Sequence, residues 1–576
     1  MARRRAAEHG LAAVLALLML APVLRPGYVL SYDMVATPRV PFTPATLGWG
    51  DGLPRAVPQD AVLAVLTTVL PGWLVQVVAL VAVGWLAVVG AARLVPSERL
   101  VVRLVAGAAY GWNAFVAERL LIGHWGLLLG YAALPWIVRA AQSARTGAHP
   151  APVVAWSALA ALTPTGGVLA AVTASAVLCA PFPRDADARR RPGVAAAVLA
   201  LNAPWVFAGA VARVSAVSDP DGVAAFAARA ENWSGTLGAV AGLGGIWNAE
   251  VVPASRTVVL APLLTALLLV VAALGVRPLL RARPGAGVLL VVAAGAVTLA
   301  LAAVVPGGEW VLGALVAHVP GAGLLRDGQK FLPPYALVLA LCFALGADRI
   351  ADALRTRGAR PAAAAVAVAA LLFPLAAMPD LAWGGAGRLV SVRYPTDWDR
   401  VATVLAADPR GELAVLPFST FRAFDWTGGR TVLDPAPRYF PVDVVVEDAL
   451  PVDIGGGDGV VSGESPRAAQ VRAALADGRS LTTAGVRWVL VERGTPGAVP
   501  ETALAGYRPV WSGSDLALYR AESAEAPARG SETVRVTVVL AGYAVPVGVL
   551  LGTLASWALT RSRRHSDTIT EHPERQ

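Results

Sequence analysis

Long apolar runs separated by short polar connections dominate the chain. A helix that crosses a membrane needs about 20 predominantly apolar residues, and the runs predict about twelve such spans. The predicted spans are 11–24, 73–92, 100–117, 125–141, 151–163, 166–181, 193–213, 256–276, 286–305, 333–349, 361–378 and 534–560. Because 151–163 and 166–181 are short, a single longer crossing is the alternative there.

Two polar stretches interrupt this pattern. A loop rich in Pro and Gly, residues 27–60, follows the first apolar run, and residues 379–533 lack long apolar runs. The second stretch carries helical and strand patterns that predict a small α/β domain. Its predicted elements are helices at 395–407 and 465–476, strands at 412–416 and 486–492, and a hairpin of 507–511 with 516–520.

These patterns predict a polytopic α-helical membrane protein in three parts. Residues 1–378 form a transmembrane domain, residues 379–533 an α/β domain, and residues 534–576 a last span with a basic tail. Arg3, Arg4 and Arg5 precede the first apolar run, and no small-residue cleavage site follows it. We therefore expect an uncleaved signal anchor with a cytoplasmic N-terminus.

Composition agrees with a membrane location. Only 15% of residues are charged, against about 25% in soluble proteins. The net charge of +9 comes from arginines in short blocks between apolar runs, which is typical of cytoplasmic loops and does not indicate nucleic acid. These blocks are Arg93 and Arg99; Arg139 and Arg145; Arg184, Arg189, Arg190 and Arg191; Arg277, Arg281 and Arg283; Arg349, Arg355, Arg357 and Arg360; and Arg561, Arg563 and Arg564.

All the blocks fall on one side if both termini are cytoplasmic. Residues 27–60 and 379–533 are then extracytoplasmic, and the chain is a multi-pass protein of the plasma membrane. Cys179 and Cys342 lie inside apolar runs and suggest neither a disulfide framework nor a metal site.

The loop 27–60 carries three carboxylates, Asp33, Asp51 and Asp60. Asp33 follows the first span by a few residues, so it is expected close to the membrane surface. A carboxylate there could act as a general base, or bind a divalent cation such as Mg or Mn together with other ligands. The alternative is a solvated aspartate without a chemical role, and no cofactor is required by the pattern.

A second polar group lies between two predicted spans, at Glu118, Arg119, His124 and Trp125. Arginine binds phosphate in a bidentate manner, and tryptophan offers a stacking face to a sugar. Glu118 and Arg119 could equally form a local ion pair at a helix end. The spacing around His124 matches no metal motif.

A third connection ends in Arg326, Asp327 and Lys330. Two cations on the outer side oppose the positive-inside trend, and anion binding would explain them. Asp327 lies between them in sequence, so structural ion pairing is an equal alternative. Residues 455–457, three glycines, are interpreted as a flexible loop and not as a phosphate cradle.

The run WNAFVAERLLIGHWGLLLGYAALPW resembles a stretch of actinobacterial α-(1→3)-arabinofuranosyltransferases, which belong to the GT-C superfamily of membrane glycosyltransferases. The runs YPTDWDRVATVLAADP, LPFSTFRAFDWTGGRTVLDPAPRYF and AGVRWVLVE are also similar to large actinobacterial membrane proteins of this type. The acidic first outer loop, about a dozen spans and an external domain fit the same layout.

This resemblance implies an enzyme that moves a sugar, arabinofuranose or mannose-like, from a polyprenyl-phosphate donor to a cell-envelope glycan such as arabinan. Asp33 then matches the catalytic acid of the first loop and Glu118 the second acidic position, and Arg326 and Lys330 fall near the lipid phosphate. The family often has paired acids in this loop, whereas Asp33 stands alone. The alternative is a non-catalytic membrane protein, either a lipid-linked sugar transporter or an envelope-assembly scaffold.

Overall fold

The structure is a computed structural model that describes residues 2–570 except 181–188, 190, 213, 215–217, 284, 454–457 and 523–531. Side chains are also left undescribed at 453, 458 and 561–570. The predicted glycine loop at 455–457, the arginines at 184 and 190, and the side chains of the basic tail therefore lie outside the described residues.

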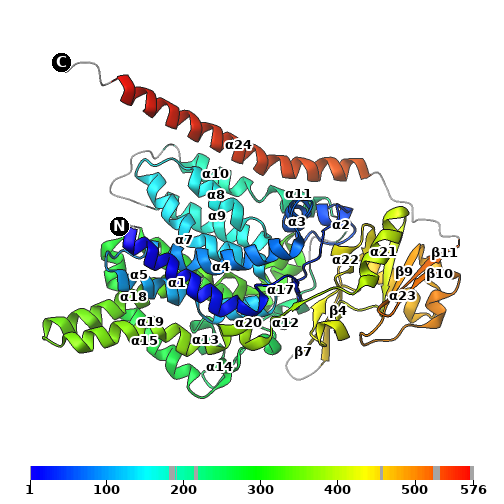
Figure 1. The fold of residues 1–576 in the computed structure, drawn as a ribbon, viewed down its shortest axis with the longest axis horizontal. Coiled ribbons are helices and arrows are strands. Elements are labelled where there is room, and N and C mark those ends of the chain that lie inside the picture. The colour runs from blue at the N-terminus through cyan, green and yellow to red at the C-terminus, as the bar shows by residue number, and fades with distance from the viewer. Residues whose placement is uncertain are drawn as a thin grey trace.

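A helical bundle forms most of the molecule, and a smaller sheet domain lies at one end of it (Figure 1). The longer helices are α1 (Ala2–Leu20), α4 (Gly72–Leu94), α5 (Leu100–Gly111), α7 (Trp125–Arg145), α9 (Pro164–Cys179), α15 (Ala261–Ala282), α16 (Ala286–Leu301), α18 (Pro333–Thr356), α19 (Arg360–Ala377) and α24 (Glu532–Thr570). The shorter ones are α2 (Pro44–Leu47), α3 (Gln59–Thr67), α6 (Ala114–Leu121), α8 (Ala151–Ala160), α10 (Arg191–Ala200), α11 (Ala203–Ala210), α12 (Asp221–Ala225), α13 (Gly235–Ala241), α14 (Ala254–Thr257), α17 (Gly308–His318) and α20 (Ala382–Gly387).

Among the described residues, seven helices are long and apolar enough to cross a membrane, or eight if the bent pair α10 and α11 is one span. The predicted count of twelve is therefore not confirmed. Of the four other predicted spans, α8 and α9 have 10 and 16 residues, fewer than a full crossing needs. The other two, α7 and α18, are 21 and 24 residues long and largely buried in the bundle.

The bend between α10 and α11 measures 52°. Pro204 stands near the start of α11 and has no backbone N–H to continue the preceding helix. Asn202 at the bend accepts a hydrogen bond from Trp205 Nε1 at 3.0 Å, so the predicted span 193–213 is interrupted by a kink.

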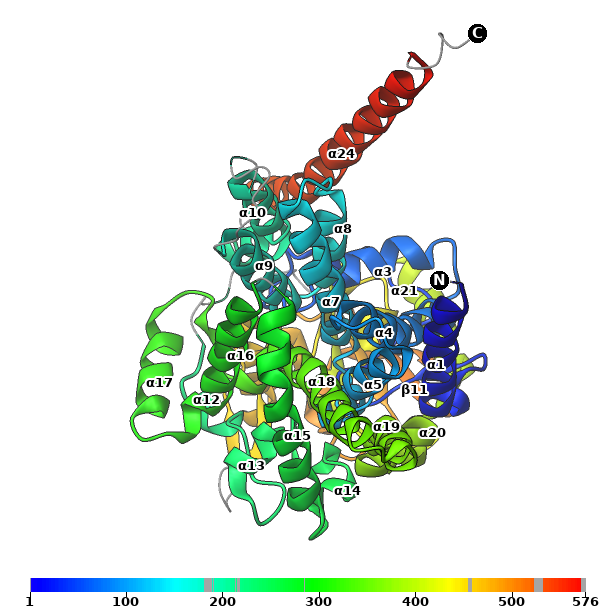
Figure 2. The same cartoon turned by 90° about the vertical axis from the view of Figure 1, so that its left-hand side faces the viewer.

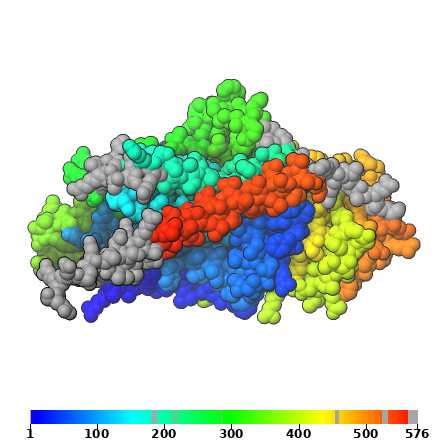
Figure 3. Space-filling view, turned by 90° about the horizontal axis from the view of Figure 1, so that it is seen from above, coloured from blue at the N-terminus to red at the C-terminus, as the bar shows by residue number. Residues whose placement is uncertain are grey.

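Both ends of the described chain lie on the side away from the sheet domain (Figure 1), and the last part of α24 extends away from the bundle (Figure 2). Figure 2 looks onto that end, where α1, α4, α5 and α7 lie side by side. In Figure 3, α24 crosses one face of the bundle as a single long helix, while α17 protrudes from another side. Which end faces the cytoplasm remains a prediction.

The sheet domain is a five-stranded mixed sheet in the order β10–β11–β9–β3–β6. Its strands are β3 (Glu412–Leu416), β6 (Asp443–Val445), β9 (Trp488–Glu492), β10 (Tyr507–Ser512) and β11 (Leu516–Ala521). The pairs β3–β9 and β3–β6 are parallel, and β9–β11 and β10–β11 are antiparallel. The predicted strands at 412–416 and 486–492 and the predicted hairpin are thereby confirmed.

Helices cover both faces of this sheet. Side chains alternate between faces along a strand, so Leu413 and Val415 pack with α21 (Thr396–Ala407), while Ala414 and Leu416 pack with α23 (Pro466–Ala476). The predicted helices at 395–407 and 465–476 are these two. Smaller strand pairs are β1 (Tyr28–Val29) with β2 (Ser391–Val392), β4 (Phe421–Arg422) with β5 (Val432–Leu433), and β7 (Leu450–Asp453) with β8 (Asp458–Val461); the last short helix is α22 (Ala436–Tyr439).

One arginine and two carboxylates are buried together in the sheet domain. Arg422 contacts Asp434 at 2.7 Å and also pairs with Glu492, and all three side chains are at most 1% exposed. Burial, and then the nearby charge of Asp434, raises the pKa of Glu492 to about 8. A single guanidinium thus neutralises one of the two acids, and the other favours its protonated form.

This arrangement predicts a pH-dependent stability. Because the folded chain holds the Glu492 proton more tightly than an unfolded chain, stability should fall as the pH rises from about 4.5 toward about 8. We expect Glu492→Gln to flatten this dependence, measured as the thermal unfolding midpoint in detergent at pH 6 and pH 8.5. Glu501→Gln, an exposed change in the same domain, is the control. An equal slope in wild type and Glu492→Gln would contradict the assignment.

Candidate active site

The loop 27–60 is held between the bundle and the sheet domain. Val29 and Met34 are buried in the core of the bundle, whereas Leu30 and Val35 are buried in the core that includes the sheet. A short stretch of chain therefore contributes to both hydrophobic cores, and Asp33 lies within it. This places Asp33 at the seam, the boundary between the two parts.

Backbone hydrogen bonds fix the seam on both sides of Asp33. The Tyr32 N–H donates to Thr431 O at 2.8 Å, and the Leu433 N–H donates to Tyr32 O at 2.8 Å. The Asp33 N–H donates to Ile122 O of the bundle at 3.1 Å. Tyr32 has a φ of 46°, a left-handed conformation that costs a non-glycine residue about 1–3 kcal/mol. These bonds hold that conformation.

Gly123 permits the close approach of the loop to the bundle. Its φ is 90°, and a Cβ atom there would lie 2.1 Å from Met34 N and 2.6 Å from Ser31 O. Glycine adopts this positive φ without strain, and it has no Cβ atom that would overlap the loop. The tight connection between α6 and α7 is thus what lets Asp33 reach His124.

A chain of hydrogen bonds runs inward from Asp33. His124 Nε2 lies 3.0 Å from Asp33 Oδ2, and His124 Nδ1 lies 3.0 Å from Arg119 Nη1. A guanidinium can only donate, so Nδ1 of a neutral His124 accepts from Arg119. The proton then sits on Nε2, which donates to the Asp33 carboxylate.

The protonation states agree with this geometry. Burial, and then the positive charge of Lys330, lowers the pKa of His124 to about 4. Burial acts to raise the pKa of Asp33, but the hydrogen bond from His124 and the positive charges of Lys330 and Arg438 hold it below its ordinary value. At neutral pH Asp33 is ionised and His124 is uncharged.

Arg119 is the fully buried centre of the site. It donates to Asp327 through two nitrogens at 2.8 and 2.9 Å and also to the Gln329 side-chain oxygen. Gln329 Nε2 in turn donates to Glu118 Oε2 at 3.2 Å. The predicted pairing of Glu118 with Arg119 at one helix end is therefore indirect, through Gln329, which comes from a distant connection.

Glu118 lies away from the exposed part of the site. It is fully buried and lies beside Glu231 and Arg256, which pair with each other at 2.7 Å. Asp33, by contrast, has a side chain that is 44% exposed. Of the two acids proposed as catalytic, Asp33 alone is open to a substrate in this arrangement.

The two cations of the third connection point to different places. Lys330 lies 3.6 Å from Asp327 and is 29% exposed, close enough for its charge to act on Asp33. Arg326 instead lies 3.5 Å from Glu464 of the sheet domain, with its guanidinium 5.5 Å from the centre of the Phe226 ring. Lys330 belongs to the site around Asp33, and Arg326 to the contact between bundle and sheet domain.

Arg438 brings a further cation to the site from the sheet domain. It lies at 2.9 Å from Asp60, and its charge acts on Asp33. Trp125 lines a small cavity under the loop together with Thr37, and Thr37 donates to Arg438 O at 3.0 Å. Asp60 therefore joins the loop to the sheet domain through its ion pair with Arg438. Trp125 lies on the side of the loop that faces the bundle.

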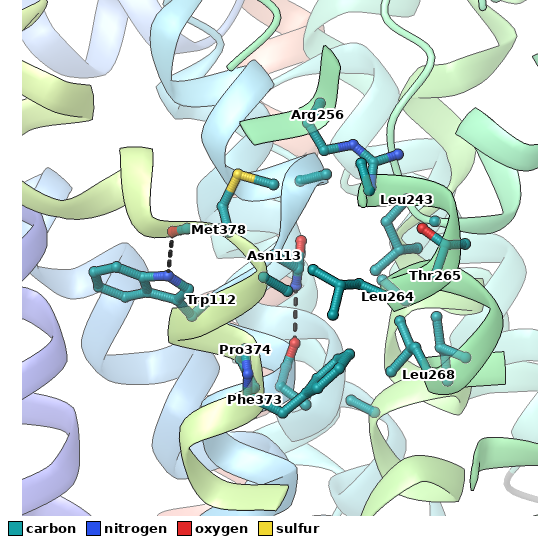
Figure 4. Close-up of a pocket in the computed structure, with 18 residues that line it drawn as sticks. Trp112, Asn113, Leu243, Arg256, Leu264, Thr265, Leu268, Phe373, Pro374 and Met378 are labelled. Atoms are coloured by element: carbon teal, nitrogen blue, oxygen red, sulfur yellow. Dashed lines mark hydrogen bonds between the residues drawn. The ribbon is translucent and has the colours of Figure 1, made fainter. Parts of the chain in front are cut away.

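A larger cavity opens between α5, α6, α15, α18 and α19 (Figure 4). Most of its lining is apolar, as at Leu264, Leu268 and Phe373, and Arg256 lies at one end. Arg256 pairs with Glu231, which lies beside Glu118. The cavity thus adjoins the inner end of the polar network.

In the part of the chain that the structure describes, no group of three or more His, Cys, Asp or Glu side chains could hold a metal ion. The third loop carboxylate, Asp51, lies near Arg535 of α24 at 3.9 Å and so is drawn away to another contact. A divalent cation at Asp33 remains a prediction.

Four important residues were not singled out by sequence: Glu231, Arg256, Gln329 and Arg438. Arg256 and Gln329 stand in short polar connections close to the predicted spans, which is a usable signal. Glu231 and Arg438 have no distinguishing local pattern, because their role depends on contacts across 25 and 378 residues of sequence.

The fit of the loop against Gly123 can be tested by substitution. Gly123→Ala adds left-handed strain of about 1–2 kcal/mol and also an overlap with the backbone of Met34. Gly321→Ala is the matched control, since its φ is 81° but no atom lies within 4 Å of the added carbon. We expect trypsin to cleave at Arg39 and Arg55 faster in Gly123→Ala than in Gly321→Ala. Equal cleavage rates would show that the loop does not depend on this contact.

No protein-family model and no curated protein matches the chain. The fold is similar to cryo-EM structures of the arabinofuranosyltransferase AftD from Mycobacteria. One has a TM-score of 0.55 at 17% identity, covering 90% of this chain and 40% of that chain; a mutant form has a TM-score of 0.55 at 18% identity, covering 90% and 42%. This chain thus spans about 40% of the length of that enzyme, and at such identity the likeness is one of fold.

Proposed function

We propose that the chain is a membrane glycosyltransferase that transfers a sugar, arabinofuranose or mannose-like, from a polyprenyl phosphate to a cell-envelope glycan. The observation that carries the proposal is the exposed, ionised Asp33 beside Lys330 at the seam. A base and a phosphate-binding cation are the two groups that this transfer needs. The likeness in fold to a mycobacterial arabinofuranosyltransferase supports the same class of reaction.

In this proposal Asp33 accepts the proton of an acceptor hydroxyl. The hydroxyl oxygen forms a bond to the anomeric carbon as the bond from that carbon to the phosphate oxygen breaks. The polyprenyl phosphate leaves with the electron pair, and the Lys330 ammonium stabilises the charge that develops on it. Neutral His124 keeps the Asp33 carboxylate oriented by donating from Nε2.

Arg119 acts on Asp33 indirectly, through His124. Its side-chain hydrogen bonds go to His124, Asp327 and Gln329, so it positions His124 and is not expected to reach a phosphate. Trp125 lines the small cavity under the loop, and we assign it to a wall of the site. Arg326 belongs to the contact between bundle and sheet domain and is not expected to touch the substrate. The residues expected to touch the substrate are Asp33, Lys330 and, from the sheet domain, Arg438.

The apolar cavity between the helices offers a place for the isoprenoid chain of the donor. Its lining includes Leu264, Leu268 and Phe373, and burial of such a chain contributes about 0.8 kcal/mol for each methylene group. A lipid held there would extend from the bundle toward the polar network. The sheet domain would then hold the glycan acceptor on the other side of Asp33.

The role of Asp33 predicts a specific loss of activity. We expect Asp33→Asn to lower transfer of radiolabelled sugar, assayed with a panel of polyprenyl-phosphate donors, by about 10²–10⁴-fold, since a general base contributes that much. The control is Asp51→Asn, which changes a carboxylate of the same loop that lies near Arg535 of α24. This variant should transfer sugar at the wild-type rate. Unchanged transfer by Asp33→Asn would remove Asp33 from the mechanism, while saturable lipid binding without transfer by the wild type would favour a transporter or scaffold.

The shifted pKa values predict the pH profile. Because the pKa of Asp33 is held below its ordinary value and that of His124 is lowered to about 4, neither group changes charge between about pH 5.5 and 7.5. The transfer rate should be constant in that range and fall only at lower pH, as Asp33 becomes protonated. An inflection near the ordinary histidine value of about 6.5, absent in His124→Gln, would contradict this account.

A further inference from the structure

A second charged site lies at the opposite end of the bundle, where α1, α4, α5 and α7 lie side by side (Figure 2). Glu8 of α1 is fully buried there and pairs with Arg93 at 3.0 Å and Arg103 at 2.7 Å. Arg283, at the end of α15, donates to Gln142 and to Leu94 O. Arginines from three helices therefore lie at this end of the bundle, and two of them pair with one carboxylate.

The charges at this place do not balance. We define the basic cluster as Arg5, Arg93, Arg103, Arg139 and Arg283. Their charges act on one another through Arg139, and five cations less one anion, Glu8, leave a local charge of +4. Arg139 is exposed, and it has no hydrogen bond or ion pair to any residue that the structure describes.

Two other arginines at the same end are neutralised by acids. Arg4 pairs with Glu98 at 2.6 Å, and Arg99 lies at 2.8 and 2.6 Å from Asp348 and Asp352. In the basic cluster, by contrast, five arginines share the one carboxylate of Glu8. Arginines held close together against their repulsion indicate a place for an anion.

Three tryptophans lie near the basic cluster. Trp85 lies 5.4 Å from the His9 ring, and Arg93 lies over Trp136 at 5.6 Å from its centre. Trp136 also stacks on Trp156 at 5.0 Å. Since tryptophan is enriched where the hydrocarbon core of a bilayer meets the head groups, this end of the bundle lies at the depth of lipid phosphates.

We propose that the basic cluster is a binding site for the head group of an anionic phospholipid. The phosphate would bind at Arg139 with its neighbours Arg5 and Arg103, and the acyl chains would extend into the bilayer beside the bundle. Basic pockets between membrane helices are known to select such head groups over neutral ones. The site is independent of the proposed transfer reaction, because it shares no residue with the group around Asp33.

The test uses the full chain purified in detergent, loaded with phosphatidylglycerol or phosphatidylcholine, with retained lipid counted by native mass spectrometry. We expect the wild type to retain phosphatidylglycerol selectively and Arg139→Gln to lose that selectivity by about tenfold or more, as for a lost charged hydrogen bond. Arg357 is an exposed residue directly after α18. Arg357→Gln therefore removes one positive charge outside the basic cluster, and this variant should retain the lipid as the wild type does.

Three results would overturn the proposal. Equal retention of phosphatidylglycerol by Arg139→Gln and the wild type would show that the basic cluster does not bind it, and an equal loss in Arg357→Gln would show only an effect of net charge. Displacement of the lipid by millimolar inorganic phosphate would assign the site to a soluble anion. Size-exclusion chromatography of each variant confirms that the protein is folded before lipid is counted.

Discussion

The hydrogen-bonded chain from Asp33 through His124 and Arg119 to Asp327 is the interaction on which the functional part of the structure depends. It joins the first outer loop, the connection between α6 and α7, and the connection before α18. Each link limits the next: Arg119 sets the tautomer of His124, and His124 sets the orientation and charge of Asp33. Removing one partner from a buried ion pair of this kind costs about 3–5 kcal/mol, so the site and the local fold are maintained together.

The same loop makes the sheet domain part of the site. Leu30 and Val35 lie in the core of the sheet domain and Met34 in that of the bundle, so Asp33 cannot move independently of either. Arg438 adds a cation from the sheet domain. A domain that binds a glycan would in this way act directly on the base, without a separate hinge or lid.

Much of the architecture could be predicted from local pattern. Apolar runs locate most of the helices, and alternation along 412–416 places Leu413 and Ala414 on opposite faces of a strand, as observed. The number of spans could not be settled in this way, because α8 and α9 are short and α7 and α18 are buried by protein. Charge placement alone also could not separate Lys330 from Arg326, four residues apart, whose partners lie in different parts of the molecule.

The most direct test of the central claim is a cryo-EM structure of the full chain with a polyprenyl-phosphate sugar donor that supports transfer. The account predicts the donor phosphate beside the Lys330 ammonium and the anomeric carbon facing Asp33, with room for an acceptor hydroxyl within about 2.6–3.2 Å of the carboxylate. A donor bound with its sugar away from the seam, and with Asp33 still turned only to His124, would contradict the assignment of Asp33 as the base.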